Sequence, residues 1–106
     1  MTMNAKARVT KKQFLADVAQ EVDMPVDVVT KVFNACVDRT KNIVADGSTL
    51  TITGFGSFYL QRHKGHPVQF EGHGEVPDYV VFKFSASDVL NRRFRELDAE
   101  GDVAVE

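Results

Sequence analysis

Thr53-Gly54-Phe55-Gly56-Ser57-Phe58 is the stretch that decides the fold, because it separates two segments of alternating polarity. Residues 49–53, which lead into it, alternate strictly, with Leu50 and Ile52 on one side and threonines on the other. After it, residues 57–61 alternate again. A period of two places successive side chains on opposite faces of a β-strand, and glycine permits a tight turn. The stretch is therefore predicted to join two antiparallel strands.

The residues upstream of this turn predict two helices with a short connection. Thr10 starts a capping box, so a first helix is expected to begin near Lys11. Asp23-Met24-Pro25 ends it, and a second helix is expected over residues 26–45, with Gly47 as its left-handed cap. In both segments apolar residues recur at three and four positions, as one buried helix face requires. A helical hairpin therefore precedes the strands.

The residues downstream of the turn predict an arm, a third strand and a last helix. Residues 62–78 are rich in Gly, His and Pro and predict a protruding β-hairpin arm, which leads into a strand over residues 78–84. Ser85 or Ser87 is expected to cap a final helix from Asp88 to about Leu97. The order of elements predicts an α+β domain with an antiparallel three-stranded sheet.

The length of 106 residues fits one domain. We expect this domain over residues 10–97, between a disordered basic extension (1–9) and a disordered acidic tail (98–106). A monomer of this size buries only a modest core, so a dimer would cover more apolar surface. No run approaches the roughly 20 apolar residues that span a membrane. The single cysteine, Cys36, is predicted to be buried in the second helix, and its isolation favours a reduced, cytoplasmic setting.

The distribution of charge matters more than its sum. A formal net charge of -2 by itself argues against nucleic-acid binding. However, the first 12 residues carry four bases and no acids, whereas residues 96–106 carry five acids and no bases. Without that acidic end, 13 bases face 10 acids. Such asymmetry indicates contact with nucleic acid.

From about Lys11 to Phe94, the chain resembles the HU/IHF family of bacterial histone-like DNA-bending proteins. The helical hairpin, the Gly-Phe-Gly-Ser-Phe turn, the arm and the short last helix come in the order of that family, and Phe84, Leu90 and Arg93 fall at the spacings of its closing positions. The resemblance implies an intertwined homodimer, or a close heterodimer. Its helices would form the base, its strands a saddle, and its two arms would embrace the minor groove of double-stranded DNA.

The resemblance also implies an architectural function: a nucleoid-associated protein that bends or compacts DNA with low sequence specificity. In such proteins phosphate charge supplies affinity and an apolar wedge on each arm opens a base step. The arm of this chain departs from the family. It lacks the string Arg-Asn-Pro followed by Thr-Gly. In its place stands His63-Lys64-Gly65-His66-Pro67, which lies nearer the base of the arm than the string of the family does. Glu71, Glu75 and Asp78 stand where the family often has lysines.

The residues predicted to contact DNA are basic, or belong to the turn or the arm: Lys11, Lys12, Gly54, Gly56, Ser57, Arg62, Lys64, His66, Pro67, Lys83, Arg92 and Arg93. Each has a structural alternative. The glycines either admit phosphate to the backbone or only form the turn. The basic strand residues contact phosphate or lie on a solvated face, and the arginines hold DNA or pair with the acidic tail. The wedge is Pro67, Val68 or Phe70.

Four apolar residues are predicted to lie in the dimer core: Phe33, Val37, Phe55 and Phe58. We expect no metal or other cofactor, since His63, His66 and His73 fit no standard zinc spacing. Neither a catalytic triad nor a glycine-rich phosphate loop stands out, so no enzymatic activity and no small-molecule substrate are expected. The alternative function is a protein-interaction module with the same fold, in which DNA binding is weak or lost.

Overall fold

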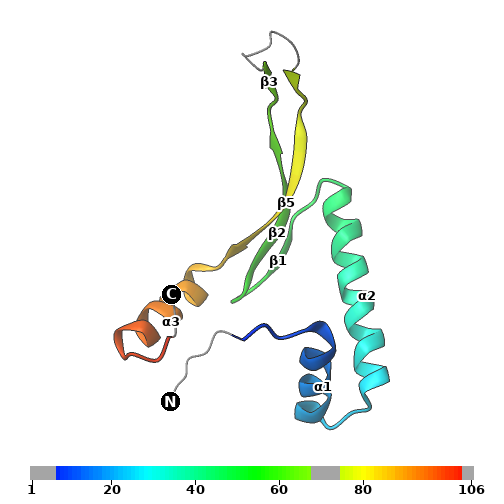
Figure 1. The fold of residues 1–106 in the computed structure, drawn as a ribbon, viewed down its shortest axis with the longest axis vertical. Helices are drawn as coiled ribbons and strands as arrows, with labels where there is room; N and C mark the ends of the chain where they lie inside the picture. The colour runs from blue at the N-terminus through cyan, green and yellow to red at the C-terminus, as the bar shows by residue number, and fades with distance from the viewer. Residues whose placement is uncertain (1–6, 68–74, 104–106) are drawn as a thin grey trace. The chain divides into compact units, whose positions relative to one another are not determined.

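The computed structural model describes residues 7–67 and 75–103. Within these ranges, the elements in chain order are α1 (Lys11–Val22), α2 (Val26–Ala45), β1 (Leu50–Ile52), β2 (Gly56–His63), β3 (His66–Pro67), β4 (Glu75–Val76), β5 (Tyr79–Ala86) and α3 (Asp88–Ala99) (Figure 1). This order confirms the predicted α+β fold. The chain divides into two structural units, residues 1–39 with 94–106, and residues 40–93.

The helices begin and end where local hydrogen bonds stop the chain. Thr10 caps α1, because its hydroxyl accepts a bond of 3.2 Å from the Gln13 amide. A left-handed residue ends each described helix: Asp23, Gly47 and Gly101, with φ of 57°, 88° and 80°. After each, the next amide bonds back five residues, at 2.8–3.2 Å. This is the Schellman motif, and it confirms the predicted role of Gly47.

The last helix is capped by Ser87, not Ser85. The Ser87 hydroxyl accepts a hydrogen bond of 3.1 Å from the Leu90 amide, as an N-cap residue does. At its other end α3 continues to Ala99, two residues past the predicted end at Leu97, because Gly101 supplies the left-handed cap. The start of the predicted acidic tail is therefore helix and capping turn. Residues 104–106 lie outside the described residues, as do residues 1–6 of the basic extension.

The sheet has the order β1-β2-β5, and all its pairs are antiparallel. Directly opposed residues share a face, and successive residues alternate between faces. One face, called the polar face below, carries Thr51, Ser57, Tyr59, Gln61, His63, Tyr79, Val81, Lys83 and Ser85. The other, called the apolar face, carries Leu50, Ile52, Phe58, Leu60, Arg62, Val80, Phe82 and Phe84. The predicted alternation is confirmed, and β2 and β5 extend past their predicted ends.

The predicted arm is the continuation of this ribbon. Figure 1 shows β2 and β5 running side by side away from β1, with β3 at the far end. There β3 and β4 form a separate pair, in which His66 opposes Val76 and Pro67 opposes Glu75. Two of the three wedge candidates, Val68 and Phe70, lie outside the described residues.

The interior of each unit is small. Leu15 and Ala19 of α1 are buried in the first unit, and Val44 and Gly56 are buried in the second. By contrast, Cys36 is exposed in the single chain, and the expectation that it is buried was wrong. Val28 and Val32 of α2 are exposed as well, so α1 leaves part of the apolar stripe of α2 uncovered.

Candidate nucleic-acid interface

The turn between β1 and β2 is held at both ends by backbone hydrogen bonds. The Phe55 amide donates to the Ile52 carbonyl at 2.9 Å, which closes the turn. Gly54 has a φ of +86°, a conformation that glycine adopts without steric cost. The Ser87 amide donates to the Phe55 carbonyl at 2.9 Å and so ties the start of α3 to the turn.

The two glycines of the turn have different surroundings. A Cβ at Gly56 would lie 2.7 Å from the Phe84 ring and would collide with the Ser85 carbonyl oxygen. A Cβ at Gly54 would meet nothing within 4 Å. Gly56 is buried and makes room for β5, a structural role that differs from the turn considered from the sequence. Gly54 is exposed, and phosphate contact at its backbone stays a prediction.

A row of hydroxyl groups crosses the polar face beside the turn. Thr51 opposes Ser57, and Ser57 opposes Ser85, so one residue from each strand of the sheet belongs to the row. The Thr51 and Ser57 hydroxyl oxygens lie 2.9 Å apart and share a hydrogen bond. Sequence reasoning selected only Ser57. Finding the other two requires the register between strands that are distant in the sequence.

The basic candidates of the ribbon do not share one face. Lys83 is exposed on the polar face, opposite Tyr59. Arg62 is exposed on the apolar face, opposite Val80. The sequence groups Arg62 and Lys83 as basic strand residues beside the arm. The register places their side chains on opposite faces of the sheet. Lys64 is exposed just after β2 ends, and at His66 the structure describes only the backbone of β3.

The remaining basic candidates lie on the helices. The Lys11 ammonium donates to the Asn34 Oδ1 at 2.8 Å and stands 5.8 Å from the centre of the Phe33 ring. Lys11 thus takes part in holding α1 to α2, a contact that the sequence did not predict. Lys12 is exposed beside it, and Arg92 and Arg93 are exposed on α3. Their contact with DNA stays a prediction.

Aromatic rings cluster at the end of the ribbon next to the turn. The Phe84 ring lies 5.0 Å from the Phe55 ring and 4.9 Å from the Phe58 ring, measured between centroids. Phe82 stacks on Phe58 at 5.9 Å. Despite these contacts, Phe55, Phe82 and Phe84 remain 45%, 51% and 43% exposed in the single chain. The cluster is therefore only half covered.

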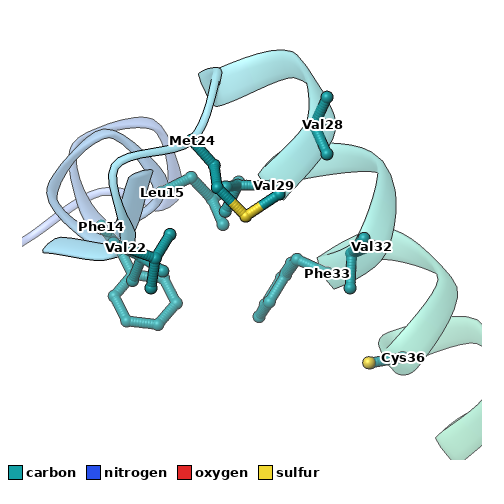
Figure 2. Close-up of a pocket in the computed structure, with 10 residues that line it drawn as sticks. Phe14, Leu15, Val22, Met24, Val28, Val29, Val32, Phe33 and Cys36 are labelled. Carbon is teal, nitrogen blue, oxygen red and sulfur yellow. The ribbon is translucent and has the colours of Figure 1, made fainter. Parts of the chain in front are cut away.

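A second apolar surface lies on the helical hairpin. Phe14 of α1 meets Phe33 of α2 edge to face, with ring centroids 5.8 Å apart. Around this pair, apolar side chains from both helices line a groove of about 340 Å³ (Figure 2). Val37 is half-buried further along α2. The predicted dimer-core residues thus belong to two clusters, Phe33 in one structural unit and Phe55 with Phe58 in the other.

Two further observations concern the described part of the chain alone. It contains no group of three or more His, Cys, Asp or Glu side chains placed to hold a metal ion. None of its helices combines the length and the apolar composition that crossing a membrane requires.

Sequence comparison relates the chain to one family. Residues 9–95 match the family model described as "Bacterial DNA-binding protein". The DNA-binding protein HU-alpha of Pseudomonas aeruginosa is 33% identical over 55 residues, which are 52% of this chain and 60% of that protein. The DNA-binding protein HU of Thermus thermophilus is 32% identical over 62 residues, 58% of this chain and 64% of that protein. These alignments thus cover about three fifths of each relative.

Solved structures share the fold. An HU–DNA cocrystal structure from Anabaena has a TM-score of 0.70 at 23% identity, and the match covers 80% of this chain and 96% of that one. An HU variant from Thermotoga maritima has a TM-score of 0.61 at 20% identity, covering 80% and 97%. A protein from Bacteroides vulgatus that is described as a bacterial DNA-binding protein has a TM-score of 0.63 at 8% identity, covering 90% and 40%. At these identities the likeness establishes the fold alone.

Proposed function

The chain belongs to the family of bacterial DNA-binding proteins that includes HU, and from this premise we propose that it is a dimeric architectural DNA-binding protein. It binds the minor groove and the phosphate backbone, and it bends or compacts DNA with low sequence specificity. The observation that carries the proposal is the two-faced ribbon. One face presents hydroxyl groups and Lys83, and the other presents a half-covered aromatic cluster.

The apolar face supports a dimer. Burial of apolar surface contributes about 25 cal/mol per Å². Three rings of the aromatic cluster, Phe55, Phe82 and Phe84, leave two fifths or more of their surface open to water. A second copy of the chain offers the same surface in return, as a two-fold symmetric interface requires. We therefore propose a homodimer. A heterodimer with a related chain would use the same surface.

The polar face supports backbone recognition more than base readout. Hydroxyl groups and lysine bind phosphate oxygens, which fix a protein on the duplex without reading its sequence. Thr51, Ser57 and Ser85 supply the hydroxyls, and Lys83 supplies the charge. Low sequence specificity follows from such a surface. The proposal includes no catalytic step, no cofactor and no small-molecule substrate. Because the proposed ligand is DNA, we infer that the protein is located with the chromosome in the cytoplasm.

A fluorescence anisotropy titration with linear, nicked and kinked duplexes tests the proposal. We expect tighter binding to the distorted duplexes, because part of the deformation is already made. We also expect affinity to fall steeply as salt rises from about 50 to about 200 mM. Lys83→Ala should weaken binding and lower the salt slope by about 0.9 for each phosphate that the variant no longer neutralises.

Lys31→Ala is the matched control, since Lys31 is exposed on α2 outside the candidate interface. It should leave the salt slope near that of the original protein. Equal effects of the two variants would show that total charge, and not the polar face, determines binding.

The alternative function is a protein-interaction module with the same fold. The formal net charge of -2 favours it, because DNA-binding domains usually carry a basic excess. The same titration separates the two functions. An absence of binding to all three duplexes at low salt would reject the architectural function.

A further inference from the structure

In the described part of the arm, the ladder between the two strands is interrupted at one place. β2 and β5 pair as far as His63 and Tyr79, and β3 and β4 pair from His66 and Val76 onward. Two residues on each strand separate these pairs, so the register is the same on both sides. The interruption is therefore not a bulge, because a bulge adds a residue to one strand only.

Pro77 explains why the ladder stops here. In an antiparallel pair, residues that exchange two backbone hydrogen bonds alternate with residues that exchange none. The Ser87 amide donates to the Phe55 carbonyl, so Phe55 and Ser87 form a bonded pair. In the same register, Gly65 and Pro77 fall at another bonded position. Proline has no N–H to donate to the Gly65 carbonyl, so this pair cannot be completed.

Asp78 supplies a different bond across the interruption: the Gly65 amide, which in a complete pair would donate to the Pro77 carbonyl, donates to the Asp78 side chain. Its Oδ1 accepts a hydrogen bond from the Gly65 amide at 2.6 Å. Hydrogen bonds to carboxylates are shorter and stronger than those between neutral groups. Beside this bond, Tyr79 stacks on His63 with ring centroids 5.1 Å apart and planes inclined by 18°. The two strands therefore stay joined across the interruption by side-chain contacts.

We propose that Asp78 is a positioning residue of the arm. Its bond to the Gly65 amide joins the two strands where Pro77 interrupts the ladder, and it sets the direction in which the outer arm leaves the sheet. The consequence for DNA, namely that this direction determines the bend, rests on the proposed function. The bond also accounts for an acidic side chain in an arm that approaches phosphate, because the carboxylate is engaged within the ribbon.

Hydrogen exchange measured by NMR on the protein without DNA tests the bond itself. Asp78→Ala removes the acceptor, and the Gly65 amide should then exchange about tenfold faster. Asp78→Asn keeps an oxygen acceptor, so its Gly65 amide should exchange more slowly than that of Asp78→Ala and faster than that of the original protein. Adding Pro77→Ala to Asp78→Ala gives residue 77 an N–H that can donate to the Gly65 carbonyl. Once this pair closes, the Gly65 amide can donate to the carbonyl of residue 77, so its exchange should slow again.

Energy transfer between dyes at the two ends of a short duplex tests the effect on bending. At saturating protein, Asp78→Ala should lower the transfer efficiency and broaden its distribution, whereas Asp78→Asn should stay near the original protein. This pair of variants also controls for charge. If the acid only repelled phosphate, both variants would tighten binding equally and neither would change the bend.

Three results would overturn the inference. Unchanged exchange of the Gly65 amide in Asp78→Ala would show that the hydrogen bond does not hold the arm. Faster exchange with an unaltered bend would remove the positioning role. Failure of the original protein to bind DNA would reject the proposed function and the bending consequence, while the exchange result, obtained without DNA, would still decide the hydrogen bond.

Discussion

The two ends of the β2–β5 ribbon are held together in different ways. At the end next to the turn, Phe84 packs against Phe55 and Phe58, and Gly56 lies against Phe84 with no room for a side chain. At the arm end, the strands are joined by one ring stack and by the bond between Asp78 and Gly65. The side chains of one end are held by close packing, and those of the other by a single ring stack and a hydrogen bond.

The difference teaches how stability and direction are divided in this molecule. Close packing tolerates almost no change of volume, so the turn end fixes the sheet. A side-chain hydrogen bond contributes about 1 kcal/mol, too little to hold a fold but enough to bias a direction. We therefore expect large stability effects at the turn end and small ones at the arm end, whereas effects on DNA bending should show the reverse order.

Phe84→Ala should produce the largest loss. It removes the ring that contacts both Phe55 and Phe58. Truncation of a fully buried phenylalanine costs about 3 to 5 kcal/mol. Urea unfolding at several protein concentrations measures it. The ring is 43% exposed in the single chain, so the loss should reach this range if a second copy covers it. A loss below about 1 kcal/mol that does not depend on concentration would contradict both the packed end and the dimer.

Gly56→Ala should cost about 2 kcal/mol or more, because its Cβ would collide with β5. Gly54→Ala, two residues away, meets no atom within 4 Å. It should cost about 1 kcal/mol, from the positive φ alone. Thermal unfolding of the two variants side by side measures the difference. If Gly54→Ala were the more damaging change, backbone conformation rather than packing would dominate the turn.

Ser87→Ala should cost about 1 kcal/mol, the usual loss for removing an N-cap side chain. The hydroxyl bonds to the Leu90 amide, while the backbone bond from Ser87 to Phe55 remains. Urea unfolding gives the free energy, and Ser85→Ala is the matched control because Ser85 does not cap α3. Equal losses in both variants would argue against the cap.

Tyr79→Ala should have the smallest effect on stability, about 0.5 kcal/mol, since it removes one cross-strand contact with His63 at the arm end. Urea unfolding gives this value, and hydrogen exchange of the arm amides should increase more than that of the turn amides. A loss as large as that of Phe84→Ala would erase the distinction between the two ends.

The sequence by itself determined the elements and their order. The change of period at residues 53–58, the caps at Thr10 and Gly47, and the apolar spacing in the helices are local signals, because neighbours along the chain decide them. These signals placed α2 at its observed bounds and α3 within two residues of its end. The predicted end at Leu97 fell short of Ala99 because Gly101, which caps the helix, lies in a segment whose acidic composition predicted a disordered tail.

Only the tertiary structure decided which side chains share a face. The sequence groups Arg62 and Lys83 as basic strand residues beside the arm, but the register assigns them to opposite faces. The same register brings Thr51 and Ser85 beside Ser57, and Asp78 beside Gly65. The physical reason is that strand pairing joins residues far apart in the chain, and a shift of one residue would exchange the two faces.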